Sequence, residues 1–177
     1  MLTLPPIPNW QAIHPLIVHF PIVLLLIAPL FILIGVLRKP HRSFPFLVVA
    51  LILMALGTVS TYVAASSGKA AGEPAENKPQ AEAVLDQHEE LAEVTQIAFS
   101  ALTLIFASIL FVPKLLKREP TPAISTILPL VFLLFYATGA ITLANTAHEG
   151  GRLVHEFGVR AQMQPSAAVA TISEDRE

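Results

Sequence analysis

Four long runs of apolar residues, separated by polar stretches, organise this chain. Each run reaches the length of about 20 residues that a helix needs to cross a hydrocarbon core of roughly 30 Å. The runs cover residues 16–37, 44–65, 94–112 and 124–146. A helix that is apolar on all sides must be surrounded by lipid or protein. The pattern therefore predicts an all-α integral membrane protein, built as a four-helix bundle.

The composition excludes an ordinary soluble domain, because 54% of the residues are hydrophobic and only 14% are charged. We expect residues 1–160 to form one membrane domain and residues 161–177, rich in Ser, Ala and acidic residues, to form a disordered tail. No internal repeat is evident in the sequence. The lipid bilayer is the partner that this composition implies, and nothing in it indicates nucleic acid.

The basic residues predict the orientation, because short cytoplasmic loops of membrane proteins are enriched in Lys and Arg. The first and third loops together hold Arg38, Lys39, Arg42, Lys114, Lys117 and Arg118. Both of these loops should face the cytoplasm, which places both termini on the outward, periplasmic side. The predicted location is the bacterial cytoplasmic (inner) membrane, crossed several times.

The longer connections suggest further structure on the outward side. The first half of the connection 66–93 is expected to be a mobile loop, and its second half a helix that runs into the third span. Near the end of the fourth span, Gly150 and Gly151 either terminate the helix or allow another segment to approach the backbone closely. The apolar residues of 153–159 should then lie along the membrane surface or under the outer connection.

Five of the six histidines fall on the predicted outward side: His14, His19, His88, His148 and His155. Outward segments also hold most of the polar residues, so this grouping can arise from composition alone. His19 is the informative one, because it should lie about one turn below the membrane surface. An ionisable group at that depth is costly unless it faces the bundle interior, pairs or binds a ligand.

His14 and His19 are poor candidates for two ligands on one helical face. Residues five positions apart on a regular helix point about 140° away from each other. His14 also precedes Pro15, which disfavours helical geometry for the residue before it. We therefore expect His14 just outside the first helix.

His88 lies in an acidic run that should be helical. Helical spacing places His88 and Thr95 on one face, with Glu89 and Glu93 together on the adjoining face. One interpretation is a solvated, acidic helix start. The other makes His88 a ligand that is oriented by a neighbouring carboxylate.

The functional hypothesis from these residues is redox chemistry at the outward face. The chain has no cysteine, which excludes thiolate metal sites and covalent attachment of c-type haem. Imidazoles can hold haem b or a transition metal such as Fe, Cu or Zn. The leading ligands for a metal are His19, His88 and His148, and His14 and His155 complete the candidate cofactor site. Residues expected to support the ligands are Glu89, Glu93, Thr95 and Glu149.

On this hypothesis the protein is an electron-transfer subunit and not an enzyme on its own. Two alternatives remain open. The first is a cofactor-free accessory or binding protein whose histidines hydrogen-bond loops or respond to pH. The second is a small transporter subunit, since Pro29 and Gly35 in the first span, and Pro129 and Gly139 in the fourth, offer helix breaks of the kind that transporters use. The spans, however, contain no Asp, Glu, Lys or Arg that would couple an ion.

Two segments give this chain a family resemblance: His14-Pro15-Leu16-Ile17-Val18-His19-Phe20-Pro21-Ile22 and His148-Glu149-Gly150-Gly151-Arg152-Leu153-Val154. With four spans between them, the chain resembles the DUF2231 family of predicted bacterial membrane proteins over residues 10–160. The resemblance implies the architecture and an association of some members with cytochrome-like proteins, but no activity. Besides the bilayer, the expected partner is a cytochrome-like redox protein or a further copy of the chain in a homo-oligomer. His155 stands where the family often has tyrosine, and Phe157 where it often has histidine.

Overall fold

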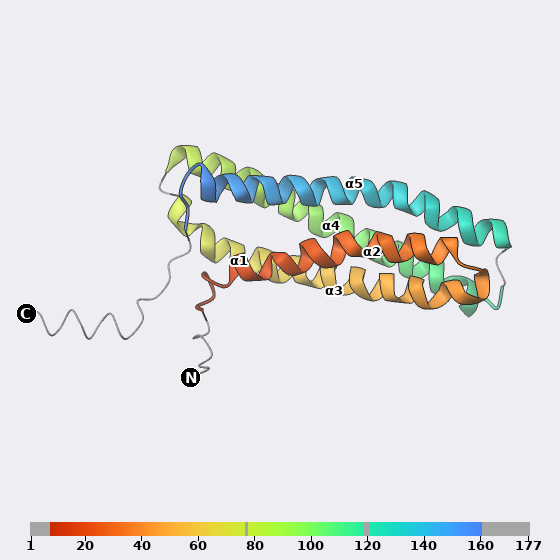
Figure 1. The fold of residues 1–177 in the computed structure, drawn as a ribbon. Helices are drawn as coiled ribbons and strands as arrows, with labels where there is room; N and C mark the ends of the chain where they lie inside the picture. The colour runs from red at the N-terminus through yellow and green to blue at the C-terminus, as the bar shows by residue number, and fades with distance from the viewer. Residues whose placement is uncertain (1–7, 77, 119–120, 161–177) are drawn as a thin grey trace, which may run out of the picture.

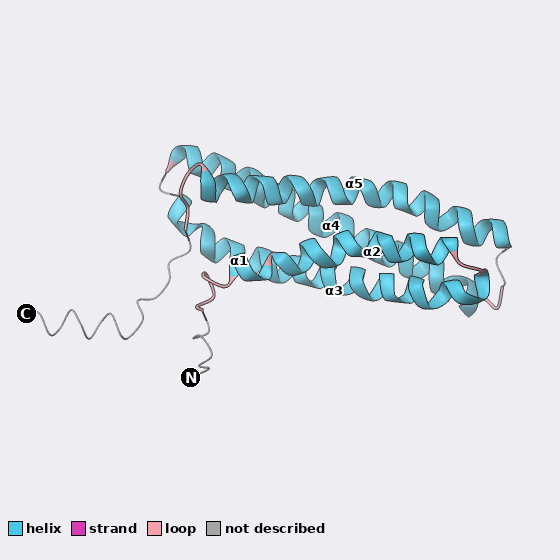
Figure 2. Ribbon diagram, in the orientation of Figure 1, coloured by secondary structure: helices cyan, strands magenta, loops and turns pink. Residues whose placement is uncertain are grey.

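The chain folds as a bundle of long helices (Figures 1 and 2). The computed structural model describes residues 8–160 except 77, 119 and 120, with only the backbone at 40, 41 and 122. The elements are α1 (His14–Ile17), α2 (His19–Leu37), α3 (Pro40–Gly72), the 3₁₀ turn η1 (Glu73–Ala75), α4 (Pro79–Leu115) and α5 (Pro122–His155). The predicted all-α four-helix architecture is confirmed. The predicted disordered tail, 161–177, lies outside the described residues.

Two helical hairpins form the bundle. The first pairs α1 and α2 with α3, the second pairs α4 with α5, and the hairpins meet where α3 packs on α4 and α2 packs on α5 (Figure 1). We call the end that holds His14 and His88 the histidine end. The opposite end, where the segments 38–39 and 116–121 connect the helices within each hairpin, is the basic end.

Four helical stretches are long and apolar enough to cross a membrane: His14–Leu37, Arg42–Ala75, Pro79–Leu115 and Ala123–His155. The chain is therefore a membrane protein whose outer surface contacts lipid. With 37 residues, α4 is about 55 Å long at about 1.5 Å per residue, which exceeds a hydrocarbon core of roughly 30 Å. The surplus length of the helices extends the bundle beyond the apolar layer.

Two of the predicted helices are longer than expected. The predicted mobile loop after the second span is helical as far as Gly72, because its alanines favour helix and Gly68 and Gly72 allow close packing. The fourth helix extends past its predicted end at residue 146 to His155, so of the two roles left open for Gly150 and Gly151, helix termination is excluded. The helix predicted for the second half of connection 66–93 is confirmed as the start of α4.

The bundle centre is filled by large side chains from all four long helices. Leu25, Phe99, Phe106 and Tyr136 are at most 1% exposed. The Tyr136 hydroxyl donates a hydrogen bond to the Leu25 backbone carbonyl, which ties α5 of the second hairpin to α2 of the first. A hydrogen bond inside an apolar bundle fixes the relative position of the two helices as well as stabilising them.

A transporter site of the kind considered above would require interrupted helices. The prolines inside α2 and α5 do not interrupt them. Pro29 lies inside α2 and Pro129 inside α5, and both helices continue through them. The nearby Gly35 and Gly139 pack against Leu47 and Leu102. The helix breaks considered for a transporter are therefore not present in α2 or α5.

A structural equivalence relates the two hairpins, although no repeat was found in the sequence. Leu25, Ala28 and Ile32 of α2 are buried at the same spacing as Phe99, Leu102 and Phe106 of α4. Gly57 of α3 packs on Leu25, and Gly139 of α5 packs on Phe99 and Leu102. The equivalent carbonyls of Leu25 and Phe99 each accept a side-chain hydroxyl from the other hairpin, from Tyr136 and Thr58 respectively. Such an arrangement corresponds to a parallel repeat about an axis along the helices.

A second, smaller apolar cluster closes the histidine end. Leu153 and Val159 are buried against Ala75, Ala81 and Val84, and Phe157 packs on the same cluster. This confirms that the segment after the fourth span is tucked under the connection between the hairpins. The cluster holds the ends of α3, α4 and α5 together around the two inward-facing histidines.

Candidate functional site

His14 faces α3 from the first turn of the first helical stretch. The short α1 begins at His14 and ends at Ile17, and α2 begins again at His19. The half-buried His14 ring places its Nδ1 atom 3.0 Å from the Ala64 carbonyl and 3.1 Å from the Ser67 hydroxyl, both on α3. The expectation that His14 lies outside any helix was therefore wrong: it is the first residue of α1.

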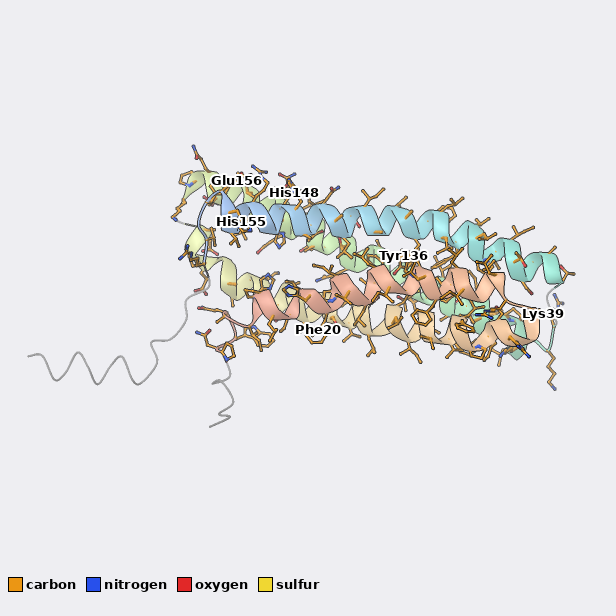
Figure 3. All side chains as sticks on the ribbon, in the orientation of Figure 1. Phe20, Lys39, Tyr136, His148, His155 and Glu156 are labelled. Carbon is orange, nitrogen blue, oxygen red and sulfur yellow. The ribbon has the colours of Figure 1, made fainter. Side chains whose placement is uncertain are left out.

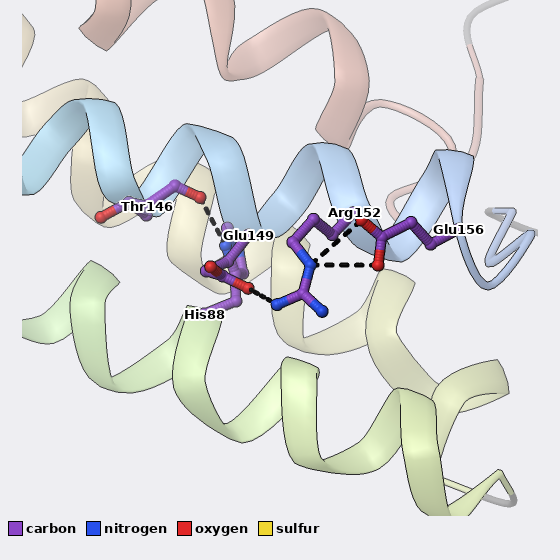
Figure 4. Close-up of polar contacts among 5 residues, drawn as sticks. All are labelled: His88, Thr146, Glu149, Arg152 and Glu156. Carbon is purple, nitrogen blue, oxygen red and sulfur yellow. Dashed lines mark hydrogen bonds and ion pairs between the residues drawn. The ribbon is translucent and has the colours of Figure 1, made fainter.

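His88 makes the corresponding contact in the second hairpin. The half-buried ring projects from α4, and its Nδ1 atom lies 2.8 Å from the Thr146 carbonyl on α5 (Figure 4). The Thr95 and Thr146 hydroxyls are 3.0 Å apart. His88 and Thr95 therefore face the same neighbouring helix, as their spacing predicted.

These contacts determine which ring nitrogen carries the hydrogen. A backbone carbonyl only accepts hydrogen bonds, so the Nδ1 atom of each histidine must donate one. In the neutral ring this leaves the Nε2 lone pair as the acceptor or ligand atom. His14 and His88 also lie within electrostatic reach of each other. The site thus contains two imidazoles in the same tautomer, one from each hairpin.

A glycine faces each ring. A Cβ atom on Gly68 would lie 2.9 Å from the His14 Cε1 atom, and one on Gly150 would lie 3.0 Å from the His88 Cε1 atom. In both hairpins this glycine follows the carbonyl acceptor by one helical turn. The close approach of a second segment is thus the role of Gly150, whereas a Cβ on Gly151 would meet nothing within 4 Å.

The second hairpin adds charged groups that the first one lacks. Glu149 is 8% exposed and pairs with the Arg152 Nη1 atom at 2.8 Å. The Arg152 Nε atom also lies 3.1 Å from Glu156 (Figure 4). Glu89 and Glu149 are both within electrostatic reach of His88, whereas Glu93 is exposed. The position on α3 that corresponds to Glu149 holds the neutral Ser67.

The structure does not bring all five of the predicted site histidines together. His19, His148 and His155 are exposed, and Figure 3 shows His148 and His155 on the outside of α5. Within the described part of the chain, no three His, Asp or Glu side chains form a group that could hold a metal ion. A role for the exposed histidines stays a prediction, while His14 and His88 form the geometric centre of the site.

Sequence reasoning missed the part of the site on α3. Ala64 was placed in the second span, and Ser67 and Gly68 in a mobile loop, but they contact the His14 ring. In each hairpin the glycine that faces the imidazole lies one turn after the carbonyl that this histidine contacts, a relation that only the structure reveals.

The fold defines a class of protein: a four-helix membrane bundle, here with two half-buried histidines at one end. The chain belongs to the DUF2231 family, whose model is described as a predicted membrane protein and matches residues 11–163. None of the curated proteins compared with the chain matches it, and no solved structure does. The family membership agrees with the architecture and assigns no activity.

Proposed function

We propose that the protein binds one haem b between His14 and His88 and serves as an electron-transfer subunit of the membrane. One observation carries the proposal: each imidazole donates from Nδ1 to a backbone carbonyl of the adjacent helix, at 3.0 Å and 2.8 Å. Histidines that ligate metals almost always donate their other ring nitrogen in this way, which orients the ring and raises its basicity.

The number of inward histidines favours haem over an isolated metal ion. Protein sites for zinc use three or four side-chain ligands, whereas haem iron already has four porphyrin nitrogens and needs only axial ligands. His14 and His88 would supply the two imidazoles that the group requires, one from each hairpin. Each half-buried ring packs against the backbone of a glycine, Gly68 or Gly150. A set of His19, His88 and His148 around one metal ion has less support, because His19 and His148 are exposed.

The chemistry would be the transfer of single electrons. When bound, haem would supply one-electron redox chemistry between cytochrome-like partners. The chain itself would hold the group through His14 and His88, exclude water with the apolar cluster of Leu153 and Val159, and orient the two imidazoles. No bond of a substrate is broken, so the protein would not be an enzyme on its own.

The test is an optical spectrum of the detergent-purified full chain, expressed with haem available, before and after reduction by dithionite. We expect a Soret band in the oxidised protein and sharp α and β bands in the reduced protein, with about one haem per chain. Elemental analysis of the same sample separates haem iron from another bound metal. A spectrum without haem bands, at full helical content, would overturn the proposal.

We also propose that the histidine end faces the periplasm in a bacterial inner membrane, because the basic loops lie at the other end. The chain has no cysteine, so a single introduced cysteine is the only thiol of the protein that a maleimide can label. In spheroplasts, a membrane-impermeant maleimide should label Glu156→Cys and leave Lys117→Cys unlabelled until the membrane is permeabilised. Both positions are exposed. Labelling of Lys117→Cys in intact spheroplasts would show that the basic end faces the periplasm, contrary to the proposed orientation.

A further inference from the structure

A half-open cavity lies at the basic end of the bundle. Its volume is about 270 Å³, it is lined by residues from α2, α3, α4 and α5, and its walls are largely apolar. Phe106, Ile109 and Leu128 contribute to these walls. This cavity is at the opposite end of the bundle from His14 and His88. Any ligand of this cavity must therefore be considered independently of the proposed haem site.

Two cationic side chains line the same cavity. Arg38 follows the end of α2, and Lys114 is in the last turn of α4. The Lys114 Nζ atom lies 3.0 Å from the centre of the Phe44 ring, and the Arg38 guanidinium lies 5.7 Å from that of Phe46. Stacking on aromatic rings positions a cation without neutralising its charge.

No carboxylate balances these cations in the described part of the chain, where the ion pairs are the two formed by Arg152 at the histidine end. The hydroxyls of Ser43 and Ser125 also line the cavity and can donate hydrogen bonds. The cavity thus combines an apolar interior with uncompensated positive charge and hydroxyl donors. An amphiphile with an anionic head matches both properties.

We propose that this cavity binds an anionic phospholipid from the adjacent membrane leaflet. Its phosphate group lies at Arg38 and Lys114, and part of one acyl chain enters between the helices. Basic pockets between membrane helices recognise anionic lipid headgroups through this combination of charge and apolar packing. A water-soluble anion would leave the apolar walls unused, and a zwitterionic lipid offers no net charge to the two cations.

The test uses native mass spectrometry of the full chain in detergent, with equimolar dioleoyl-phosphatidylglycerol and dioleoyl-phosphatidylcholine. We expect one retained phosphatidylglycerol, preferred over phosphatidylcholine by about tenfold or more, given the typical attraction between a basic side chain and anionic lipid. The double variant Arg38→Gln/Lys114→Gln should lose this preference. The control Lys117→Gln/Arg118→Gln removes the same charge from exposed positions at the same end and should keep it.

A second variant tests the acyl-chain part with every cation intact. Ser125→Phe fills the cavity and should reduce lipid retention at least severalfold, with circular dichroism showing unchanged helical content. Equal retention of the two lipids by the unmodified chain would overturn the proposal. So would an equal loss of preference in the two double variants, which would indicate diffuse attraction to the loops. Full retention by Ser125→Phe would exclude the cavity as the binding site.

Discussion

Replacing either His14 or His88 with alanine is expected to abolish the haem spectrum of the purified protein. Loss of only the group that orients a metal ligand already weakens binding about 10- to 100-fold, so loss of an axial ligand should lower the haem content at least about tenfold. Both rings are half-buried and held by backbone carbonyls, so neighbouring side chains cannot take over their role. The measurement is the Soret absorbance per chain.

The matched control for this prediction is His148→Ala. His148 lies at the same end of the bundle, in the second of the two family-like segments, but its side chain is exposed. We expect its haem content to equal that of the unmodified chain. If His148→Ala loses haem while His14→Ala and His88→Ala retain it, the ligand pair proposed here is wrong. Circular dichroism of each variant separates loss of haem from loss of fold.

The second large effect is expected on stability, at Gly57, where α3 packs closely against α2. A Cβ atom on Gly57 would lie 2.7 Å from the Cγ and Cδ2 atoms of Leu25, which is completely buried. Gly57→Ala must therefore push α2 away from α3 or force Leu25 out of its rotamer. Overpacking of this kind costs about 1–3 kcal/mol. We expect the free energy of unfolding to fall by about 2 kcal/mol.

Gly151→Ala is the matched control, because Gly151 is also helical but a Cβ atom there meets nothing within 4 Å. Alanine is intrinsically better than glycine in a helix interior by up to about 1 kcal/mol, so this variant should be neutral or slightly more stable. Titration of dodecyl sulfate into micelles, followed by circular dichroism, measures both. Equal effects of the two substitutions would show that Gly57 does not control the packing.

The equivalence of the two hairpins was hidden from the sequence for a physical reason. The positions that match are defined by burial and contact, and different side chains satisfy the same requirement. Leu25 and Phe99 fill equivalent volumes, and Thr58 and Tyr136 reach the equivalent carbonyls from different positions. The two hairpins have the same residue at equivalent positions where no other side chain could replace it. These positions are His14 and His88, Gly57 and Gly139, and Gly68 and Gly150.

The site was predictable in part. Helical spacing correctly placed His88 and Thr95 on one face, and separated His14 from His19 by direction. Spacing alone did not say which of His14 and His19 faces the bundle. The packing of this helical stretch on α3 turns His14 towards α3 and leaves His19 exposed. The depth of a residue in the membrane therefore did not predict which histidine the bundle encloses.

The sequence by itself determined the class of this protein. Hydrocarbon excludes unpaired backbone groups and most charges, so apolar runs of sufficient length had to become spanning helices, and the charged and histidine-bearing segments had to lie at their ends. Tertiary structure alone decided which of those polar residues meet. His14 contacts Ala64, and His88 contacts Thr146, because glycines one turn further along α3 and α5 let an imidazole approach the backbone. Contacts between helices depend on packing around the whole bundle, and no single stretch of the chain encodes them.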